Sequence, residues 1–350
     1  MVLDKINNLL SDGIEQGEFT HAAVALGNLE NEKAEYVRVF EDKNRNIFDL
    51  ASLTKALVTG YLMGFVLRSN NLKPSATVRD YCETLGITSR LNSLIKHQTI
   101  ESILGHYSSF PAWGCLWINR LGVVDNLWED RDKLIITNLN RIISERPALS
   151  PVYSDLGYIL LGFLIERALK MDMSAAFDTF VAKNMTNFIG YLPIVSENTA
   201  FKCISTGYCQ IRRKTLEGEV HDENCASLGG VSGHAGLFGT IEGVVELLNF
   251  YNRSVRFDYF GKNASLVGNS QSPDGLFGLR RNLEESTKDF YNSAAIGHLG
   301  FTGTSFYVEP NTKNYVVFLT NRVIKQRVSR KISDYRKQVH LLAGRYFNGI

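Results

Sequence analysis

Apolar and polar residues follow patterns that predict strands near both ends of the chain. Segment 4–17 has apolar residues at helical spacing, and the runs 21–29 and 33–40 have the composition of two strands joined by a turn. Two further strands are predicted at 304–310 and 314–321, again joined by a short turn. The strand-forming sequence therefore comes from the two ends of the chain.

The region between these strand pairs has a mainly helical pattern. Helices are predicted at about 51–68 and 241–252, and the stretch of about 70–200 is mainly helical but broken by prolines. A last helix is predicted at about 326–347. This order does not alternate strand and helix, which disfavours a doubly wound parallel sheet. We expect an α+β fold: an antiparallel sheet built from both chain ends, flanked by helices, with an inserted mainly helical lobe.

The composition is that of a globular protein and gives no sign of a nucleic-acid partner. The 350 residues are 44% hydrophobic and 21% charged, with a net charge of +2. Such a balance provides no electrostatic surface for nucleic acid or for an anionic membrane. Basic residues near the C-terminus are spaced as on an amphipathic helix, and we interpret them as a solvated helix face rather than a binding patch. They are Arg327, Arg330, Lys331, Arg336 and Lys337.

Cysteine usage and the N-terminal residues bear on the compartment. None of the five cysteines forms a C-x-x-C pair, so neither a disulfide framework nor a metal site is expected. Free thiols in a reducing compartment are the simplest interpretation. Residues 1–19 lack the charged, apolar and cleavage regions of a signal peptide. We expect a cytoplasmic protein, or a periplasmic or secreted one if the sequence is a processed form.

The apolar stretch 50–67 holds the first candidate for chemistry. It has about the minimum length of a membrane span, but polar groups interrupt it, so we expect a buried core helix and no membrane span. Ser52 and Lys55 lie three residues apart, on one face of this helix. Because the surroundings of Lys55 are apolar, we expect burial to lower its pKa. A partly neutral amine beside a hydroxyl can activate that hydroxyl as a nucleophile, although a helix cap with a snorkelling lysine is the simpler alternative.

A second candidate group lies where another helix is predicted to begin. Pro151 and Ser154 mark this start, and an apolar run follows at once. Tyr153 and Asp155 flank Ser154 and would point their side chains into a cleft. A tyrosine close to a lysine loses its proton more easily and can relay it. Taken alone, the same residues also fit an ordinary helix cap.

The third candidate is the glycine-rich segment 297–304, GHLGFTGT, which leads into a predicted strand. Glycines at such a place let the backbone approach a ligand closely, and a strand edge can offer an N–H group to an oxyanion. The segment contains His298, Gly300 and Phe301 as candidate site residues. A glycine-rich turn without further function is the alternative.

In the order S-x-x-K, Y-x-D and H-x-G, the three groups resemble the motifs of the serine β-lactamase and penicillin-binding-protein superfamily. The sequence is most similar to the group related to class C β-lactamases, which includes esterases, DD-peptidases and D-aminopeptidase-like enzymes. Two further segments, ILGHYSSFPAW at 103–113 and the glycine-rich segment 218–240, extend the resemblance over nearly the whole chain. The combination is specific for the family and only weakly specific for the substrate.

The resemblance implies a covalent mechanism and a role for each matching residue. Ser52 matches the acylated serine and Lys55 the lysine that takes its proton. Tyr153 matches the tyrosine that relays protons to the leaving group and from the deacylating water. Gly300 matches the motif glycine, and the backbone N–H groups of Phe301 and Ser52 would form the oxyanion hole. The chemistry implied needs no metal and no organic cofactor.

Three positions depart from the family pattern. Asp155 stands where many relatives have an asparagine that contacts the substrate amide. His298 stands where β-lactamases and penicillin-binding proteins usually have lysine, whereas esterase- and peptidase-like relatives often have histidine. Leu299 replaces the usual threonine, whose hydroxyl helps to bind a substrate carboxylate. We therefore expect weak β-lactamase activity or none.

The resemblance also implies the domain organisation and the class of substrate. We expect a single domain over 1–350, with an α/β lobe of about 1–70 plus 235–350 and a helical lobe of about 71–234, and the active site between the lobes. The predicted substrate is an ester, an amide or a short peptide, with D-amino-acid-containing and peptidoglycan-derived peptides among the candidates. The alternatives are a catalytically weak penicillin-binding or sensor protein of the same fold, and a true β-lactamase. The sequence predicts no oligomeric state.

Other polar residues invite a functional interpretation less strongly. His106 is expected to have a structural role near the cleft. The adjacent His221, Asp222 and Glu223 lack an H-x-x-x-H partner, so a loop-fixing network bordering the cleft is favoured over a metal or acid–base cluster. His234 lies between glycines and is interpreted as a turn residue. The tryptophans, Trp113 among them, are interpreted as packing residues, with a place in the cleft as the alternative.

Overall fold

The computed structural model describes most of the chain. The described residues are 1–31, 34–117, 127–192, 202–254, 280–281, 295–325 and 331–349. All statements below concern these residues.

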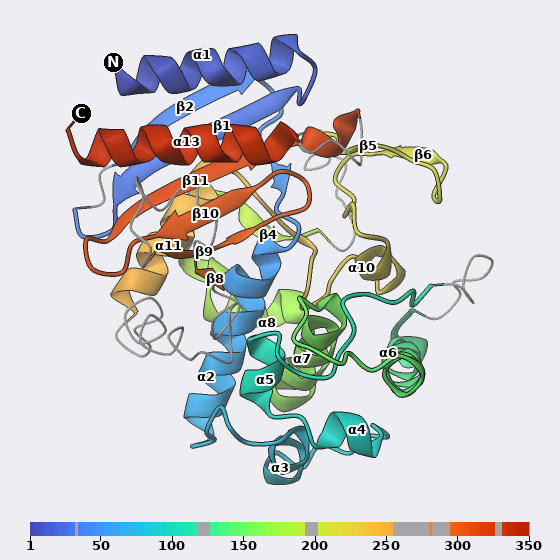
Figure 1. Cartoon of the computed structure of the whole chain (residues 1–350). Coiled ribbons are helices and arrows are strands. Elements are labelled where there is room, and N and C mark those ends of the chain that lie inside the picture. Colours follow the sequence, from blue (N-terminus) through green and yellow to red (C-terminus); the bar gives the residue numbers. More distant parts are fainter. Residues whose placement is uncertain are drawn as a thin grey trace.

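The main sheet has six antiparallel strands, drawn from both ends of the chain (Figure 1). The first and last of its long strands are neighbours, because β1 pairs with β11 from Ala22 opposite Thr320 to Asn28 opposite Asn314. This confirms the predicted α+β fold with a sheet built from both chain ends. In spatial order the strands are β2 (Ala34–Phe40), β1 (His21–Asn28), β11 (Asn314–Thr320), β10 (Ser305–Val308), β9 (Ile296–Leu299) and β8 (Arg280–Arg281).

Strand β1 is apolar at nearly every position because helices cover both faces of the sheet. Ala22, Val24 and Leu26 pack with α1 (Val2–Glu15) and α13 (Lys331–Phe347), which lie side by side across one face (Figure 1). The alternate residues Ala23 and Ala25 belong to the larger core on the other face. That core includes the helix that follows Ser52 and α11 (Ile241–Arg253). Successive side chains of a strand point to opposite faces, so a strand covered twice shows no polar alternation.

Most of the remaining helices form a second region around α7 (Asp155–Leu169). Residues 156–166 of α7 are all buried, which explains why this helix is apolar all round. The Ser154 hydroxyl caps it by accepting from the Gly157 N–H at 3.2 Å, as the sequence predicts. The other elements here are α3 (Val78–Thr84), α4 (Ser93–Lys96), α5 (Ile100–Leu104), α6 (Leu127–Glu145), α8 (Met173–Phe180), η2 (Ala182–Asn184) and α10 (Glu223–Ser227).

The helix after Ser52 and a small second sheet connect the two regions. The helix opens with a π-helical turn, η1 (Lys55–Gly60), and continues as α2 (Tyr61–Ser69). It is a buried core helix, as predicted, and no helix in the described parts of the chain is long and apolar enough to cross a membrane. The small sheet pairs β3 (Phe48–Asp49) with β7 (Leu237–Gly239), and β7 with β4 (Ile189–Tyr191). The small sheet therefore brings the residues before Ser52 beside the end of the glycine-rich segment 218–240. The remaining elements are β5 (Gly207–Cys209), β6 (Lys214–Leu216) and η4 (Arg322–Ile324).

One prediction needs correction here, and another lies partly outside the described residues. The segment 297–304 is not simply a turn before a strand, because its first residues form β9 and only Gly300–Gly303 make the turn into β10. Gly303 takes a left-handed φ of 104° there, a conformation that glycine adopts without strain. The last helix begins at Lys331 in the structure, and the predicted start at 326 lies outside the described residues, as do Arg327 and Arg330.

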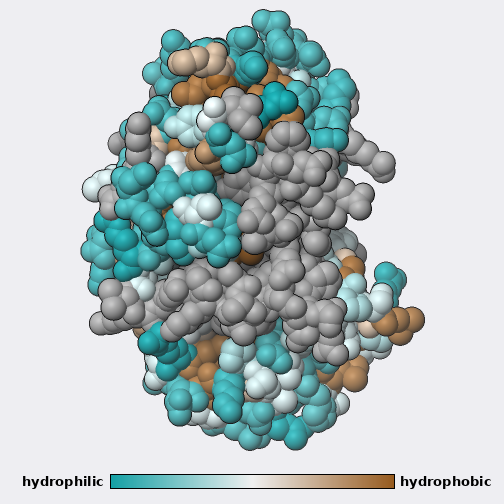
Figure 2. Space-filling view, turned by 60° about the vertical axis from the view of Figure 1, so that its left-hand side comes forward, coloured by the Kyte–Doolittle hydropathy of each residue, from teal (hydrophilic) through white to brown (hydrophobic). Residues whose placement is uncertain are grey.

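Few large apolar side chains among the described residues are well exposed. The face shown in Figure 2 is mostly hydrophilic where it is coloured. The large apolar side chains that are well exposed are scattered along the chain, and two of them, Trp113 and Phe301, are 50% and 46% exposed. Single exposed apolar residues are normal on a protein surface, but these two line the same cavity.

Candidate active site

Ser52 lies at the entry to the helix that carries Lys55, and the backbone before it is held by Asp49. The buried Asp49 carboxylate accepts hydrogen bonds from the Ala51 N–H at 2.8 Å and from the His221 N–H at 2.7 Å. Burial raises the pKa of Asp49 to about 6, against an ordinary value of 3.8. Ala51 has a left-handed φ of 49°, which is uncommon for a residue with a side chain. Strain of this kind persists only where the surrounding bonds fix it, and here it directs Ser52 toward a cavity.

Three side chains form a continuous series of close contacts beginning at Ser52. The fully buried Lys55 Nζ donates to Ser52 Oγ at 2.9 Å and lies 2.7 Å from Asp155 Oδ1. Its other acceptor is the backbone carbonyl of His234, at 3.0 Å. The ammonium is therefore surrounded by oxygen atoms on three sides. The helical spacing that placed Ser52 beside Lys55 was correct, whereas the contact with Asp155 joins two distant parts of the sequence.

The predicted lowering of the Lys55 pKa is wrong. Burial does work in that direction and is the largest single effect on this group. The charges of Asp155 and Tyr153 and their hydrogen bonds act in the opposite direction, and together they raise the pKa of Lys55 above its usual value. A buried cation keeps its proton when an anion lies this close.

Tyr153 lies between two histidine rings at the start of α7. Its ring is 4.4 Å from that of His106 and 5.9 Å from that of His298, measured between centroids. Lys55 Nζ is 5.0 Å from the centre of the tyrosine ring. Burial raises the pKa of Tyr153, and the nearby Lys55 ammonium offsets this rise only in part. We expected the neighbouring lysine to lower the pKa of Tyr153 below its usual value, and this expectation is wrong for the cleft without substrate.

His106 holds the segment that carries Tyr153 and Asp155. Its Nδ1 accepts a hydrogen bond from the Ser154 N–H at 3.0 Å, so the proton of the neutral ring is on Nε2. His106 is buried and has a left-handed φ of 59°. The predicted structural role near the cleft agrees with these contacts.

The turn between β9 and β10 forms the opposite side of the cavity. Gly300 is required there, because a Cβ would collide with the Thr304 side chain and the Leu50 carbonyl. Arg336, from α13, donates to the carbonyls of Gly300 and Thr304 at 2.7 and 2.8 Å. Arg322 donates through Nε to the Phe301 carbonyl at 2.7 Å, and its guanidinium lies 4.5 Å from the centre of the Phe301 ring. Arg336 is thus not part of a solvated helix face, which corrects that prediction.

His298 lies on β9, behind this turn, and is buried. Its Nδ1 is 2.7 Å from the carbonyl oxygen of Leu299. On the side of the active site, its ring neighbours that of Tyr153. The structure therefore places His298 against the tyrosine, whereas Leu299, Gly300 and Phe301 line the cavity itself.

His221, Asp222 and Glu223 border the cavity and take part in a bonded network. Asp222 caps α10 by accepting from the Cys225 N–H at 2.7 Å, and its Oδ1 lies 2.8 Å from His234 Nε2. The other ring nitrogen of His234 lies 2.9 Å from the Ser232 hydroxyl. His234 is thus a buried bridge and not only a turn residue. No cluster of three or more His, Cys, Asp or Glu side chains in the described part of the chain is arranged to hold a metal ion.

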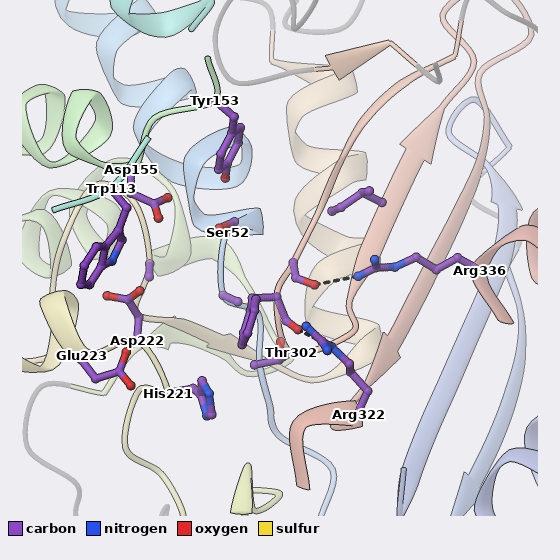
Figure 3. Close-up of a pocket in the computed structure, with 15 residues that line it drawn as sticks. Ser52, Trp113, Tyr153, Asp155, His221, Asp222, Glu223, Thr302, Arg322 and Arg336 are labelled. Atoms are coloured by element: carbon purple, nitrogen blue, oxygen red, sulfur yellow. Dashed lines mark hydrogen bonds between the residues drawn. The ribbon is translucent and has the colours of Figure 1, made fainter. Parts of the chain in front are cut away.

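The cavity has a volume of about 440 Å³ and two sides of opposite charge. Asp155, Asp222 and Glu223 form what we call the acidic side, together with Trp113. Arg322 and Arg336 form the arginine side, together with the turn from Leu299 to Thr302. Figure 3 shows Ser52 between the two sides. Asp49 and Arg322 were not predicted from the sequence, and a place in the cleft was only the alternative for Trp113, because no local pattern distinguishes these residues.

Comparison with known proteins agrees with this geometry. The family model described as "Beta-lactamase" matches residues 20–340. The chain belongs to the beta-lactamase family. The resemblance of its three motifs to this superfamily is thereby confirmed, and the protein is a beta-lactamase-family hydrolase.

Relatives of this hydrolase carry several different activities in their names. It is 26% identical over 316 residues to an N-acetylmuramyl-L-alanine amidase of Bacillus subtilis, covering 80% of this chain and 69% of that one. It is 25% identical over 311 residues to a putative D-alanyl-D-alanine carboxypeptidase of Escherichia coli K12, covering 79% and 69%.

Among solved structures, D-amino acid amidase from Ochrobactrum anthropi SV3, complexed with L-phenylalanine, superposes with a TM-score of 0.70. The superposition has 15% identity and covers 99% of both chains. At this identity the likeness shows the beta-lactamase fold over the whole chain and nothing about the substrate.

Proposed function

We propose that the protein hydrolyses an amide or ester bond through an acyl-enzyme on Ser52. One observation carries this proposal: the Ser52 hydroxyl accepts a hydrogen bond from Lys55 Nζ at 2.9 Å and lines a cavity large enough for a small molecule. A nucleophile in contact with a base, with the base held by a third group, is the arrangement required for covalent catalysis. Here the third group is Asp155.

Attack by Ser52 requires Lys55 to accept the Ser52 proton. Because Lys55 is an ammonium in the free cleft, it must first pass a proton to a neighbour, and Asp155 Oδ1 at 2.7 Å is in position to take it. The Asp155 side chain is 20% exposed, so a substrate that fills the cavity would remove its water. Loss of water favours the neutral pair of amine and carboxylic acid over the ion pair. The neutral amine then accepts the Ser52 proton as the hydroxyl oxygen bonds to the substrate carbonyl.

The later steps follow the roles that the family resemblance implies. The oxyanion of the tetrahedral intermediate accepts hydrogen bonds from the backbone N–H groups of Ser52 and Phe301. The bond to the leaving group then breaks, and the leaving group takes a proton from Tyr153 or Lys55. Water attacks the acyl-enzyme, gives a proton back to the same groups, and releases the acid and free Ser52.

We propose a short peptide or an amino acid amide as the substrate, with D-amino-acid and peptidoglycan-derived compounds as candidates. The names of the amidase and carboxypeptidase relatives support amide hydrolysis. The pair His298 and Leu299, in place of lysine and threonine, supports weak β-lactamase activity or none. The alternatives are a true β-lactamase and a weakly catalytic penicillin-binding or sensor protein of this fold.

The test compares the wild type with Ser52→Ala, using a fluorophosphonate probe and a p-nitrophenyl ester. We expect labelling and turnover by the wild type, and loss of labelling with at least about a thousandfold lower kcat/KM in Ser52→Ala. Ser69→Ala, at an exposed serine outside the cavity, serves as the matched control and should behave as the wild type.

Two outcomes would separate the alternatives. A single acylation without turnover would favour the penicillin-binding or sensor protein. Rapid hydrolysis of nitrocefin that disappears in Ser52→Ala would make the protein a true β-lactamase. If the wild type showed no labelling and no turnover, the proposed function itself would be contradicted.

A further inference from the structure

Asp222 has one carboxylate oxygen bonded to the protein and a second oxygen available to a ligand. Oδ1 accepts from the Cys225 N–H at 2.7 Å and lies 2.8 Å from His234 Nε2. Within the parts of the chain that the structure describes, Oδ2 has no hydrogen-bond partner. The side chain is 26% exposed and lines the cavity that contains Ser52. A ligand in this cavity can therefore reach Oδ2.

The surroundings of Asp222 keep its carboxylate ionised. Burial alone would raise its pKa, but the His234 ring and the Cys225 N–H hold the pKa of Asp222 well below its usual range. The same contacts fix the position of the carboxylate, because His234 is itself buried and bonded through its other nitrogen to Ser232. A carboxylate that is both ionised and fixed in position thus faces the cavity.

An aromatic side chain stands on the same side. Trp113 lines the cavity with half of its side chain exposed. Figure 3 shows Trp113, Asp155, Asp222 and Glu223 on one side of Ser52, with Arg322 and Arg336 on the other. Asp155 is already paired with Lys55. An ionised oxygen and an exposed indole are the two kinds of group that attract an organic cation in proteins.

We propose that Asp222, with Trp113 beside it, binds a protonated amine on the substrate. The preferred substrates are then amides or esters whose acyl group carries a free amine, such as amino acid amides and short peptides with a free N-terminus. The proposal rests on the proposed function only in assigning Ser52 as the group that attacks the bound substrate. The binding of the amine can be measured without catalysis.

A protonated amine fits better than a neutral donor for a reason of charge. His234 and the Cys225 N–H contact only Oδ1 of Asp222, so a substrate that fills the cavity and removes water from Oδ2 must itself supply a partner for this ionised oxygen. An ammonium supplies a charge-assisted hydrogen bond, whereas the hydroxyls of a sugar or an acetylated nitrogen supply only neutral hydrogen bonds. The indole adds attraction for a cation in particular.

The experiment measures binding to the Ser52→Ala protein by isothermal titration calorimetry. The probes are D- and L-phenylalaninamide and their N-acetyl derivatives, at about pH 7. We expect at least one free-amine probe to bind at least tenfold more tightly than its N-acetyl counterpart. In Ser52→Ala with Asp222→Asn this difference should disappear, because the asparagine can still cap α10 but carries no charge.

Asp172→Asn on the same background is the matched control. Asp172 caps α8 through a hydrogen bond from the Ala175 N–H at 2.8 Å, as Asp222 caps α10, and it lies outside the catalytic cavity. The control removes the same charge from the same kind of position and should keep the preference for the free amine. The melting temperatures of both variants show whether the fold is retained.

Each result bears on the proposal. A preference that persists in Asp222→Asn, or one that is lost equally in Asp172→Asn, would overturn it. So would equal binding of the free and acetylated probes, or tighter binding of the acetylated ones, which would instead indicate neutral donors such as sugar hydroxyls. Binding of the amine by a protein that fails the Ser52 labelling test would contradict the hydrolase and leave the amine site supported.

Discussion

The two sides of the cleft carry opposite charges, and they hold those charges in different ways. On the acidic side each fixed carboxylate has a side-chain partner: Asp155 has Lys55, and Asp222 has His234. On the arginine side the guanidinium groups bond to backbone carbonyls, those of Gly300, Phe301 and Thr304. The acidic side is therefore arranged to control protons and charge, whereas the arginine side fixes the shape of a turn. Substitutions on the two sides should consequently differ in kind as well as in size.

The largest effect is expected for Asp155→Asn, a substitution on the acidic side. The measurement compares the pH dependence of kcat/KM on a p-nitrophenyl ester between this variant and the wild type. In the proposed mechanism Lys55 passes its proton to Asp155 inside the cavity, so activity of the wild type does not require Lys55 to lose a proton to solvent. Without the carboxylate that loss is required, and the acidic limb of the profile moves to higher pH. We expect activity at about pH 6 to fall about a hundredfold.

The control for this prediction is again Asp172→Asn, whose profile should match that of the wild type. An acidic limb that stays in place in Asp155→Asn would show that the carboxylate takes no part in the proton transfer. It would also place Asp155 with the substrate-binding residues, the role that the sequence analysis gave it.

The next effect concerns the stability of the fold and involves Asp49, a buried residue whose carboxylate accepts a hydrogen bond from the His221 N–H. Its pKa in the folded protein, about 6, is above the ordinary 3.8, so folding favours the protonated form. The stability that this group provides is present in full below the unfolded pKa and is lost as the pH rises through about 6. Between about pH 4.5 and pH 7.5 the ionisation of Asp49 should cost about 2 kcal/mol.

Urea unfolding of the wild type and Asp49→Asn across this pH range tests the prediction. The variant will be less stable at every pH, because the amide cannot accept from both the Ala51 and the His221 N–H groups. The informative quantity is the pH dependence of its unfolding free energy, which should be flatter than that of the wild type. Parallel curves would show that Asp49 does not titrate in this range.

The smallest effect is expected on the arginine side. Arg336→Met removes both hydrogen bonds to the turn before β10, so the Phe301 N–H is held less accurately at the proposed oxyanion hole. We expect kcat to fall about fivefold while KM changes little, and to the same extent for charged and uncharged substrates. A large rise in KM confined to substrates with a carboxylate would show that Arg336 recognises the substrate.

Much of the fold was predictable because its central elements have strong local patterns. Strand β1 and helix α7 are continuous apolar runs, and a recognisable cap residue, Ser154, precedes α7. The strands β3, β4 and β7 are two or three residues long, too short for any periodicity, and they could not be predicted. Strand β9 was concealed by its glycine, which is atypical of strands but lies against the Phe306 carbonyl.

The candidate site was predictable where its residues are close in sequence and not where they meet only in space. Ser52 and Lys55 follow from helical spacing. The charge of Lys55 depends on Asp155, and the position of Asp222 depends on His234, contacts that only the folded chain creates. Arg336 fits an amphipathic helix by its spacing, yet its side chain lines the cleft. This could not be predicted, because helix periodicity does not say which part of the protein a helix face meets.

The place of β11 in the sheet has a consequence for how the protein is made. This strand lies between β1 and β10 in the sheet, yet the ribosome produces it long after β1. The hairpin of β1 and β2 therefore has an unpaired edge until β11 has been made, and an unpaired apolar edge is prone to aggregation. Contacts that join the two ends of a chain also slow folding. The growing chain should thus depend on chaperones until the segment around residue 320 has emerged.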